Sequence, residues 1–319
     1  MKVISEVPYK VLNKKGLVLA IGVFDGVHRG HQRLLKEVVK TAKRLCYVSG
    51  VITFDPHPIQ ILNPAAALPL VIPLKERLKL IASLGIKACM VVNFTKSLSG
   101  QSGGEFLEKY ILSRFALKAI IVGEDFRFGS GKGSSIDDMI RIGKEKGFAV
   151  KVVKLSRKRK HKIGSSTVRH HISLGELSEA RKLLGRSYSV FGKVEKGYGR
   201  GKVMGFPTAN ISSEGIVLPP DGVYAVFVRI DKEIYSGMAS IGYRPTFESS
   251  KTDRNIEVFI FDFSRDIYKK EIEIIFAKRL RDEVKFASSA DLIAEMKKDK
   301  IAASKILKRI TVRGLHLSL

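Results

Sequence analysis

The chain has 319 residues, of which 45% are hydrophobic, and its formal net charge is +26 at pH 7. This length predicts about two domains with packed cores. No apolar run is long enough to cross a bilayer, so we expect no membrane partner. The first residues lack the features of a signal or transit peptide, and Cys46 and Cys89 are expected to be buried free thiols. These features together predict a cytoplasmic protein.

The excess of Lys and Arg has two interpretations. A basic surface binds nucleic acids, but positive potential also attracts small anionic ligands. The chain has no Trp, and its basic runs are not interleaved with aromatic residues that could stack on bases. We therefore expect no nucleic-acid partner. The oligomeric state and the reason for so basic a surface stay open.

The segment 17–45 predicts a strand, a glycine-containing loop and an amphipathic helix. Leu17–Phe24 is a near-continuous apolar run, which is typical of a strand buried on both faces. His28 and His31 stand at the start of the helix, where free backbone N–H groups and the helix dipole favour phosphate. Gly26 and Gly30 let the backbone approach such a ligand closely. The alternative is that one histidine caps the helix and the other is solvated.

Strands and helices then alternate along the chain. Strands are expected at 47–54, 87–94, 118–122 and 148–155, and helices at 75–84, 104–115 and 135–146. This order predicts a parallel sheet with crossover helices, a Rossmann-like α/β fold. Ligands of such sheets bind beyond the carboxyl ends of the strands. Two loops there are candidates for a pocket: Phe54 to Pro58, which is equally well explained as a rigid turn, and the loop of Asp125.

A basic run at 157–162 leads into a segment of small hydroxyl residues that ends at Arg169. The run alone is typical of a solvated loop or of nucleic-acid contact. Ser165, Ser166 and Arg169 at a helix start can hold a triphosphate through backbone, hydroxyl and guanidinium donors. A short helix is expected over 172–184, and the domain boundary is expected at 184–186.

The second half of the chain has a different character. Short β-rich runs at 188–194, 223–230, 234–241, 256–263 and 271–276 predict a small antiparallel barrel or sandwich. A closing helix is expected from about 288 to 308, with Ser288 or Ser289 as its N-cap. A glycine run at 197–205 precedes Thr208 and Asn210. Such a run can wrap phosphates, and the two side-chain oxygens suit Mg²⁺; a plain β-turn is the alternative.

Nine motifs, taken in order, resemble the bacterial bifunctional riboflavin kinase/FMN adenylyltransferases, also called FAD synthetases. The resemblance covers nearly the whole chain: FDGVHRGHQ, TFDPHP, VGEDFRFG, GSSTVR with LLGRSY, GRGKVMGFPTAN, LPPDGVYA, IGYRPTF, IEVFIFDFSRDIY and RDEVKF. It implies a nucleotidyltransferase domain over 1–184 that joins FMN and ATP into FAD and pyrophosphate. It further implies a β-barrel domain with a C-terminal helix over 185–319 that phosphorylates riboflavin with ATP and Mg²⁺ to FMN.

The resemblance also implies a role for each matched residue. The catalytic set is His28, His31 and Arg169 for adenylyl transfer and Glu257 as general base of the kinase. Residues that bind ATP or its phosphates are Gly22, Phe24, Asp25, Gly30, Ser165, Ser166, Gly197, Gly201, Lys202, Gly205, Pro207, Thr208 and Asn210, of which Thr208 and Asn210 also organise Mg²⁺. The flavin-binding set is Phe54, Asp55, Pro56, His57, Pro58, Asp125, Arg281, Glu283 and Phe286. Without the resemblance, Glu257 is explained as a residue on an exposed strand face.

The triphosphate segment departs from the family pattern. Counting back from Arg169, Gly164, Ser165 and Ser166 stand where the family has Ser-Ser-Thr, so one phosphate-binding hydroxyl is absent. This departure leaves one alternative to the bifunctional enzyme, a kinase whose first module has lost or changed its activity. The net charge of +26 leaves a second, a basic nucleic-acid-binding protein. The sequence does not determine the relative strength of the two activities or a preference for reduced flavin.

Overall fold

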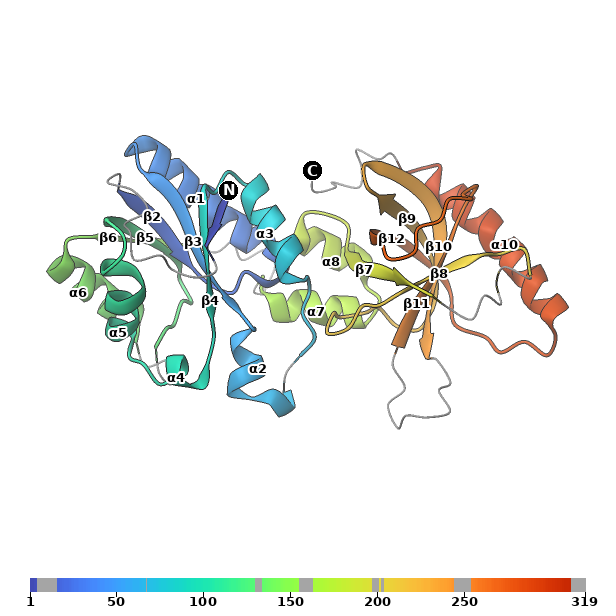
Figure 1. Ribbon diagram of the computed structural model, residues 1–319, viewed down its shortest axis with the longest axis horizontal. Helices are drawn as coiled ribbons and strands as arrows, with labels where there is room; N and C mark the ends of the chain where they lie inside the picture. Colours follow the sequence, from blue (N-terminus) through green and yellow to red (C-terminus); the bar gives the residue numbers. More distant parts are fainter. Residues whose placement is uncertain are drawn as a thin grey trace. The chain divides into compact units, whose positions relative to one another are not determined.

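The computed structural model describes residues 1–4, 16–66, 68–129, 134–154, 163–196, 201, 204–243 and 254–310. These residues form two compact units (Figure 1), the first from residues within 1–68 and 74–165 and the second from residues within 69–73 and 166–318. Among the described residues, no helix has both the length and the apolar character that a bilayer crossing requires.

The first unit is built on a six-stranded sheet in the order β1-β4-β3-β2-β5-β6, and every neighbouring pair is parallel. Its strands are β1 (Lys2–Ile4), β2 (Leu17–Ile21), β3 (Val48–Asp55), β4 (Ala88–Asn93), β5 (Leu117–Gly123) and β6 (Ala149–Val153). All five residues of β2 are buried, as a central strand covered on both faces requires. The predicted Rossmann-like sheet is confirmed.

Crossover helices connect these strands. They are α1 (Arg29–Arg44), α3 (Leu74–Ser83), α5 (Gly103–Leu107) with its π-helical continuation η3 (Glu108–Leu112), and α6 (Ile136–Lys146), with short turns α2 (Pro58–Leu62), α4 (Lys96–Ser99), η1 (Asp25–Val27) and η2 (Pro64–Ala66). Leu107, Ile111 and Met139 are fully buried with strand side chains in one apolar core. Helix α6 begins with a capping box in which Ser135 and Asp138 bond each other's backbone N–H.

The second unit is a closed barrel in the order β10-β11-β8-β7-β12-β9, with antiparallel pairs throughout. Its strands are β7 (Ser189–Glu195), β8 (Thr208–Ile211), β9 (Gly222–Ile230), β10 (Glu233–Tyr243), β11 (Arg254–Ile260) and β12 (Glu271–Arg281). Helices α7 (Ser165–Ser173), α8 (Leu177–Leu184) and α10 (Ser289–Leu307) complete it (Figure 1). The predicted barrel and closing helix are confirmed, and Ser288 is the N-cap.

Alternate residues of the barrel strands serve two different cores. One set, including Val190, Ile256 and Val258, fills the barrel interior together with Val168 and Ile172 of α7 and Leu184 of α8. The other set faces outward, where Phe227 and Phe259 pack against Ala303 and Leu307 of α10. The packing of α7 and α8 places them with the barrel unit. The boundary predicted at 184–186 concerns the functional modules and stays a prediction.

Two expectations about local structure are wrong, and one strand was not predicted. The helix expected over 172–184 is two helices, because Gly175 takes a left-handed conformation (φ 75°) between α7 and α8. Residues Thr208–Ile211, which none of the predicted β-rich runs includes, form strand β8, because the barrel closes only if this short polar segment pairs with β7 and β11. Cys46 is exposed after the end of α1, whereas Cys89 is buried as expected.

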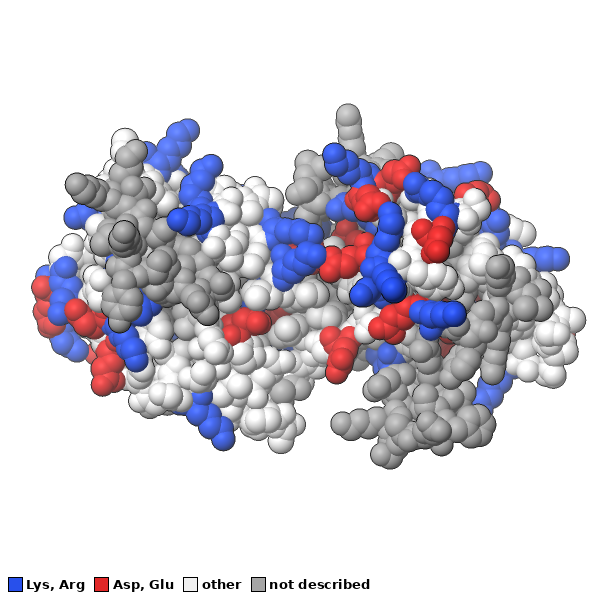
Figure 2. Space-filling model, in the orientation of Figure 1, with Lys and Arg blue, Asp and Glu red and all other residues white. Residues whose placement is uncertain are grey.

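The two signs of charge are mixed on the visible surface. Figure 2 shows Lys and Arg side chains interspersed with Asp and Glu on the face it draws, with no single broad basic patch among the described residues of that face. Among the described residues, several exposed cations are members of ion pairs, such as Arg265 with Glu233 and Lys270 with Asp231.

Candidate active sites

The loop between β2 and α1 is held in an unusual backbone conformation. Phe24, Gly26 and Val27 all have positive φ, at 56°, 75° and 41°. Such values are rare for residues other than glycine, and rarest for a β-branched one. Phe24 and Val27 are each only 1% exposed, so packing on both sides fixes the loop. Backbone strain of this kind clusters at functional sites.

This loop delivers the two histidines to the start of α1. His28 is the N-cap, and its Nδ1 accepts a hydrogen bond from the backbone N–H of His31 at 3.3 Å. The two imidazole rings stack with their centroids 3.6 Å apart and an 18° interplanar angle. The rings of Phe24 and His31 form an edge-to-face pair whose centroids are 5.2 Å apart. His28 therefore does cap the helix and is buried, whereas His31, the other histidine, is partly buried rather than solvated. The pair is positioned as a single unit.

The charge state of His31 is set by its surroundings. Burial, the neighbouring His28 and the guanidinium of Arg77 together hold the pKa of His31 well below its usual value. His31 is therefore a neutral imidazole at pH 7. Its Nδ1 is buried and has no hydrogen-bond partner in the part of the chain that the structure describes.

Three loops of the first unit share one edge of the sheet. Strands β3, β2 and β5 are parallel neighbours, so the segments after their carboxyl ends lie along the same edge. These segments carry Asp55, the histidine pair and Asp125. Asp55 and Asp125 are exposed at this edge. The topology therefore places these three segments along one edge of the sheet, and their roles in a common site stay predictions.

The other predicted residues of the first unit have visible structural roles. Phe54 packs against Phe94 and Phe106, and His57 caps α2 by accepting from the N–H of Ile59 at 3.1 Å. Ser165 donates its hydroxyl to the carbonyl of Asp25 at 2.9 Å. Of the other predicted residues, Asp25 and Gly30 are buried and Gly22 is partly buried, while Pro56 and Pro58 flank His57. Ser166 and Arg169 lie on α7 in the second unit, and their role stays a prediction.

The second candidate site is a cavity of about 440 Å³ on the outer face of the barrel. A volume of this size suits a small-molecule ligand. The barrel unit contributes Thr208, Glu257 and Glu283 to its lining, and α10 contributes Asp299. Its apolar lining is Met204, Val223, Met238, Phe259, Leu292 and Met296.

Strand register explains why the polar residues of this cavity meet. Glu257 of β11 is directly opposite Asn210 of β8 and Ser240 of β10, and directly opposed residues share one face of a sheet. The hydroxyl of Thr208 donates to a carboxylate oxygen of Glu257 at 3.4 Å. The flanking Ile256 and Val258 are fully buried in the barrel interior. Glu257 does alternate along an exposed strand face, and that face is the wall of the cavity.

Glu283 is a further carboxylate of this site, and Asp221 influences its pKa. Glu283 lines the cavity so closely that a side chain at Gly242 would meet its carboxylate oxygens at 2.5 Å. Burial raises the pKa of Glu283, Asp221 and Glu257 raise it further, and Arg281 opposes them. Glycine at position 242 is what allows this approach.

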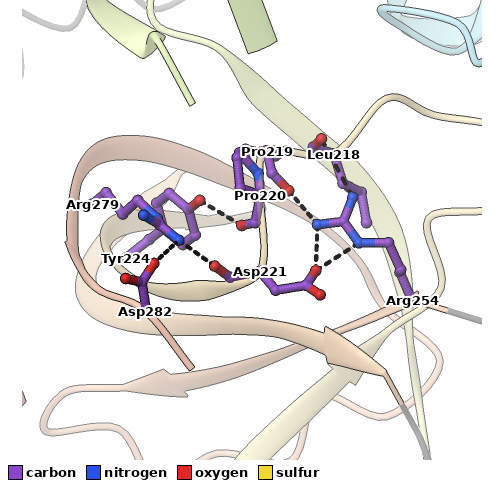
Figure 3. Close-up of polar contacts among 8 residues, drawn as sticks. All are labelled: Leu218, Pro219, Pro220, Asp221, Tyr224, Arg254, Arg279 and Asp282. Carbon is purple, nitrogen blue, oxygen red and sulfur yellow. Dashed lines mark hydrogen bonds and ion pairs between the residues drawn. The ribbon is translucent and has the colours of Figure 1, made fainter. Parts of the chain in front are cut away.

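A polar cluster joins segments that are next in sequence to residues lining the cavity (Figure 3). Arg254 pairs with Asp221, with its Nε 2.8 Å from Oδ1, and also donates to the carbonyl of Pro219. Arg279 donates to the carbonyl of Asp221 and pairs with Asp282, and the hydroxyl of Tyr224 donates to the carbonyl of Pro220 at 2.6 Å. These bonds tie the starts of β9 and β11 to the end of β12. Val223, Asn255 and Arg281 of these three strands line the cavity.

The remaining predicted residues of the second unit are placed as follows. Gly201 and Arg281 line the cavity. Phe286 lies under the Arg281 guanidinium, 5.6 Å from it, and Asn210 is buried beside the cavity. Gly205 and Pro207 are exposed on either side of buried Phe206, while Gly197 and Lys202 lie outside the described residues.

Comparison with known proteins agrees with this division. The family model described as FAD synthetase matches residues 10–167, and the one described as riboflavin kinase matches residues 184–307. A curated bifunctional riboflavin kinase/FMN adenylyltransferase from Listeria monocytogenes is 38% identical over 88% of this chain and 90% of its own length. The chain belongs to the bifunctional riboflavin kinase/FMN adenylyltransferase family. A relative with the same name from Bacillus subtilis is 35% identical over 89% of this chain and 90% of its own length.

A solved structure also resembles this family member over its whole length. A crystal structure named as a macrolide-efflux protein from Streptococcus pneumoniae matches with a TM-score of 0.83 and 31% identity, and the match covers 95% of this chain and 99% of that one. That name describes the Streptococcus pneumoniae protein alone.

Sequence reasoning about this family missed two residues that the structure places at the sites. Asn255 lines the cavity, and its Nδ2 donates to Oδ1 of Asn210 at 3.0 Å. Arg77 is buried beneath the histidine loop. An arginine on an amphipathic helix is usually a surface residue, so the sequence around Arg77 carries no signal of its burial. Asn255 could have been found from its position two residues before Glu257, on the same strand face.

The ion pair between Arg281 of β12 and Asp299 of α10 is expected to stabilise the packing of α10 on the barrel. Both carboxylate oxygens of Asp299 accept from Arg281, at 2.8 to 3.1 Å, and the Asp299 side chain is 7% exposed. We expect Asp299→Asn to lower the free energy of unfolding of the barrel unit by about 2 kcal/mol, because a buried charge-assisted bond is lost. Urea unfolding of the full chain measures this, with stabilisation by added riboflavin identifying the barrel's transition.

The matched control for Asp299→Asn is Asp262→Asn. Asp262 lies 3.6 Å from Lys300 of α10, but its side chain is 91% exposed, and solvent screening makes such a pair almost neutral. We expect no measurable change for this variant. Equal losses for the two variants would show that the buried geometry of the Arg281 pair has no special weight.

Proposed function

We propose that the chain makes FMN and FAD in two successive ATP-dependent reactions, one at each site, with functional modules over 1–184 and 185–319. The observation that carries the proposal is that two separate sites exist, one in each compact unit. A stacked histidine pair occupies a helix start at the edge of a parallel sheet, and a carboxylate adjoins a threonine in a barrel cavity. The use of ATP fits a cytoplasmic location, which is part of the proposal.

In the barrel, Glu257 acts as the general base. It takes the proton of the ribityl 5′-hydroxyl of riboflavin as that oxygen attacks the γ-phosphorus of ATP. The bond between the γ-phosphorus and its bridging oxygen breaks, and ADP leaves with FMN as the product. Arg281, Glu283 and Phe286 hold the flavin ring. Residues of the glycine run, Gly197, Gly201, Lys202 and Gly205, together with Pro207, lie along the phosphates of ATP.

The donors beside Glu257 fit Mg²⁺. Thr208 offers a hydroxyl and Asn210 an amide oxygen, and this hard cation prefers a few protein oxygens completed by phosphates. Among the described residues, no group of three His, Cys, Asp or Glu side chains could hold a metal ion. Mg²⁺, when bound, neutralises phosphate charge. Asn255 holds Oδ1 of Asn210 at 3.0 Å and so fixes the amide's orientation.

In the first unit, His28 and His31 act on the phosphates of ATP during adenylyl transfer. A phosphate oxygen of FMN attacks the α-phosphorus, the bond to the β-phosphate's bridging oxygen breaks, and pyrophosphate leaves. The imidazoles and the amino end of α1 stabilise the charge that develops on these oxygens. Gly22, Phe24, Asp25 and Gly30 shape this pocket. Ser165, Ser166 and Arg169 hold the triphosphate, and Phe54 to Pro58 with Asp125 line the flavin side.

Product analysis tests the proposal directly. Purified full-length chain incubated with riboflavin, ATP and Mg²⁺ is expected to yield FMN first and FAD later, separated by chromatography with fluorescence detection. Chelation of Mg²⁺ is expected to stop both products. Formation of neither product in the complete mixture would reject the proposal. FMN without FAD would favour a kinase whose first module has lost activity, the alternative raised by Gly164.

A further inference from the structure

Arg77 is a charged side chain at the centre of the first unit, and the proposed mechanism gives it no role. It comes from α3 and is only 1% exposed. Removing a charge from water costs several kcal/mol unless the group is paired and hydrogen-bonded. An apolar residue in this place would avoid that cost, so the contacts of Arg77 call for a functional explanation.

The guanidinium joins the ends of two neighbouring strands. One terminal nitrogen donates to the carbonyl of Val23 at 2.8 Å, and the other donates to the carbonyl of Phe54 at 3.1 Å. Val23 follows β2 and precedes the strained loop of the two histidines. Phe54 lies at the end of β3, where the predicted flavin-side loop begins. A planar fork with two donors holds both carbonyls in one fixed geometry, which the rotatable donors of a lysine ammonium on its flexible stem do not do.

The position of Val23 is secured twice. Its carbonyl also accepts the hydroxyl of Thr53, which is fully buried, at 2.9 Å. One backbone oxygen of the histidine loop is therefore bound both by the neighbouring strand and by α3. On the flavin side, the carboxylate of Asp55 lies 4.0 Å from the guanidinium. Arg77 is thus in contact with backbone or side chain on both sides of the expected reaction centre.

Charge adds a second link to the histidines. Burial lowers the pKa of Arg77, while Asp25, Asp55 and Cys89 act in the opposite direction, and an arginine stays protonated throughout. Its positive charge lowers the pKa of His31, and burial and the neighbouring His28 lower that pKa as well. The charged or titratable groups that bear on His31 are thus His28 from the same helix end and Arg77 from α3.

We infer that Arg77 is a positioning residue for adenylyl transfer, which sets the spacing of the histidine loop and the flavin-side loop. Its positive charge adds a second effect, because it disfavours protonation of His31. The inference rests on the proposed function of the first unit. The two halves of the role are separable, because the fork sets the spacing and the charge acts at a distance. A lysine in this place retains the charge and loses the fork, whereas a methionine loses both.

The experiment compares Arg77→Lys and Arg77→Met with wild type, using the full chain, FMN, ATP and Mg²⁺. For Arg77→Met we expect kcat/KM for FAD formation to fall about tenfold or more at pH 7, because displaced reacting groups lose rate steeply. We also expect the acid limb of its pH profile to move to higher pH, since His31 then keeps its proton to higher pH. For Arg77→Lys we expect a fall in kcat/KM with the acid limb unmoved.

Several controls make the result decisive. Lys79→Met changes an exposed cation of the same helix and is expected to leave both kcat/KM and the profile unchanged. Methionine leaves the carbonyls of Val23 and Phe54 without the guanidinium donors, so far-UV circular dichroism and thermal unfolding are used to verify that the first unit of each variant is folded, and FMN formation from riboflavin is the internal reference for the barrel. The inference is overturned if both variants keep the wild-type rate, or if Arg77→Met loses rate with its acid limb unmoved. Wild type that forms no FAD would instead refute the proposed function.

Discussion

Replacing Glu257 by glutamine is expected to reduce the conversion of riboflavin to FMN by about a hundredfold or more, since a positioned general base contributes a factor of this order. Glutamine keeps the size of the side chain and its contact with Thr208, 3.4 Å away, but it cannot accept the proton of the ribityl hydroxyl. Adenylation of supplied FMN takes place in the other unit and is expected to continue at the wild-type rate. Chromatography of the products from riboflavin and, separately, from FMN measures both.

Glu271→Gln is a suitable control for this variant. Glu271 is an exposed glutamate at the start of β12 in the same barrel, outside the residues that line the cavity. We expect it to leave FMN formation unchanged. A Glu257→Gln protein with near-normal FMN formation would remove Glu257 as the base. Loss of both activities would argue against two independent sites.

Replacing His28 is expected to have the converse effect. Loss of a donor that stabilises developing charge costs about a hundredfold, so His28→Ala should impair FAD formation from FMN to this extent. FMN formation from riboflavin should persist. The same substitution also removes the N-cap of α1, which accepts the N–H of His31, and such a loss costs about 1 kcal/mol of stability.

His28→Asn separates the two effects. An asparagine side chain is among the best helix caps, so this variant is expected to retain the thermal stability that His28→Ala loses. It lacks the imidazole, so FAD formation should be impaired as strongly as in His28→Ala. Recovery of FAD formation in His28→Asn would mean that His28 contributes only the helix cap. Thermal unfolding and product chromatography on the same preparations distinguish these cases.

The fold was predictable where local pattern and tertiary structure agree. The buried run of β2 and the alternation of helices with strands suffice to predict a parallel sheet, and the short β-rich runs predict the barrel. Strand β8 was missed because its four residues, Thr-Ala-Asn-Ile, have neither length nor strong β-propensity. It forms because β7 and β11 offer it partners, which is information from distant parts of the chain.

The sites were predictable to a different extent. His28, Thr208 and Glu257 were found through motifs that resemble a family, and the structure adds the contacts that make each of them part of a pair. Arg77 and Asn255 were missed because their importance lies in their contacts. Arg77 binds backbone carbonyls at the ends of two strands, and Asn255 binds the side chain of Asn210. A residue that acts through its neighbours leaves no local signature in a sequence.

The alternation along β11 has a consequence for how the barrel must be assembled. Ile256 and Val258 fill the interior while Glu257 between them faces the cavity. A slip of one residue against β8 or β10 would send the carboxylate into the hydrocarbon centre and two aliphatic side chains into water. The free-energy cost of such a register shift is large. The register that buries the aliphatic side chains is therefore also the one that places Glu257 in the cavity. Selection for a sound fold and selection for a working base therefore favour the same pairing of strands.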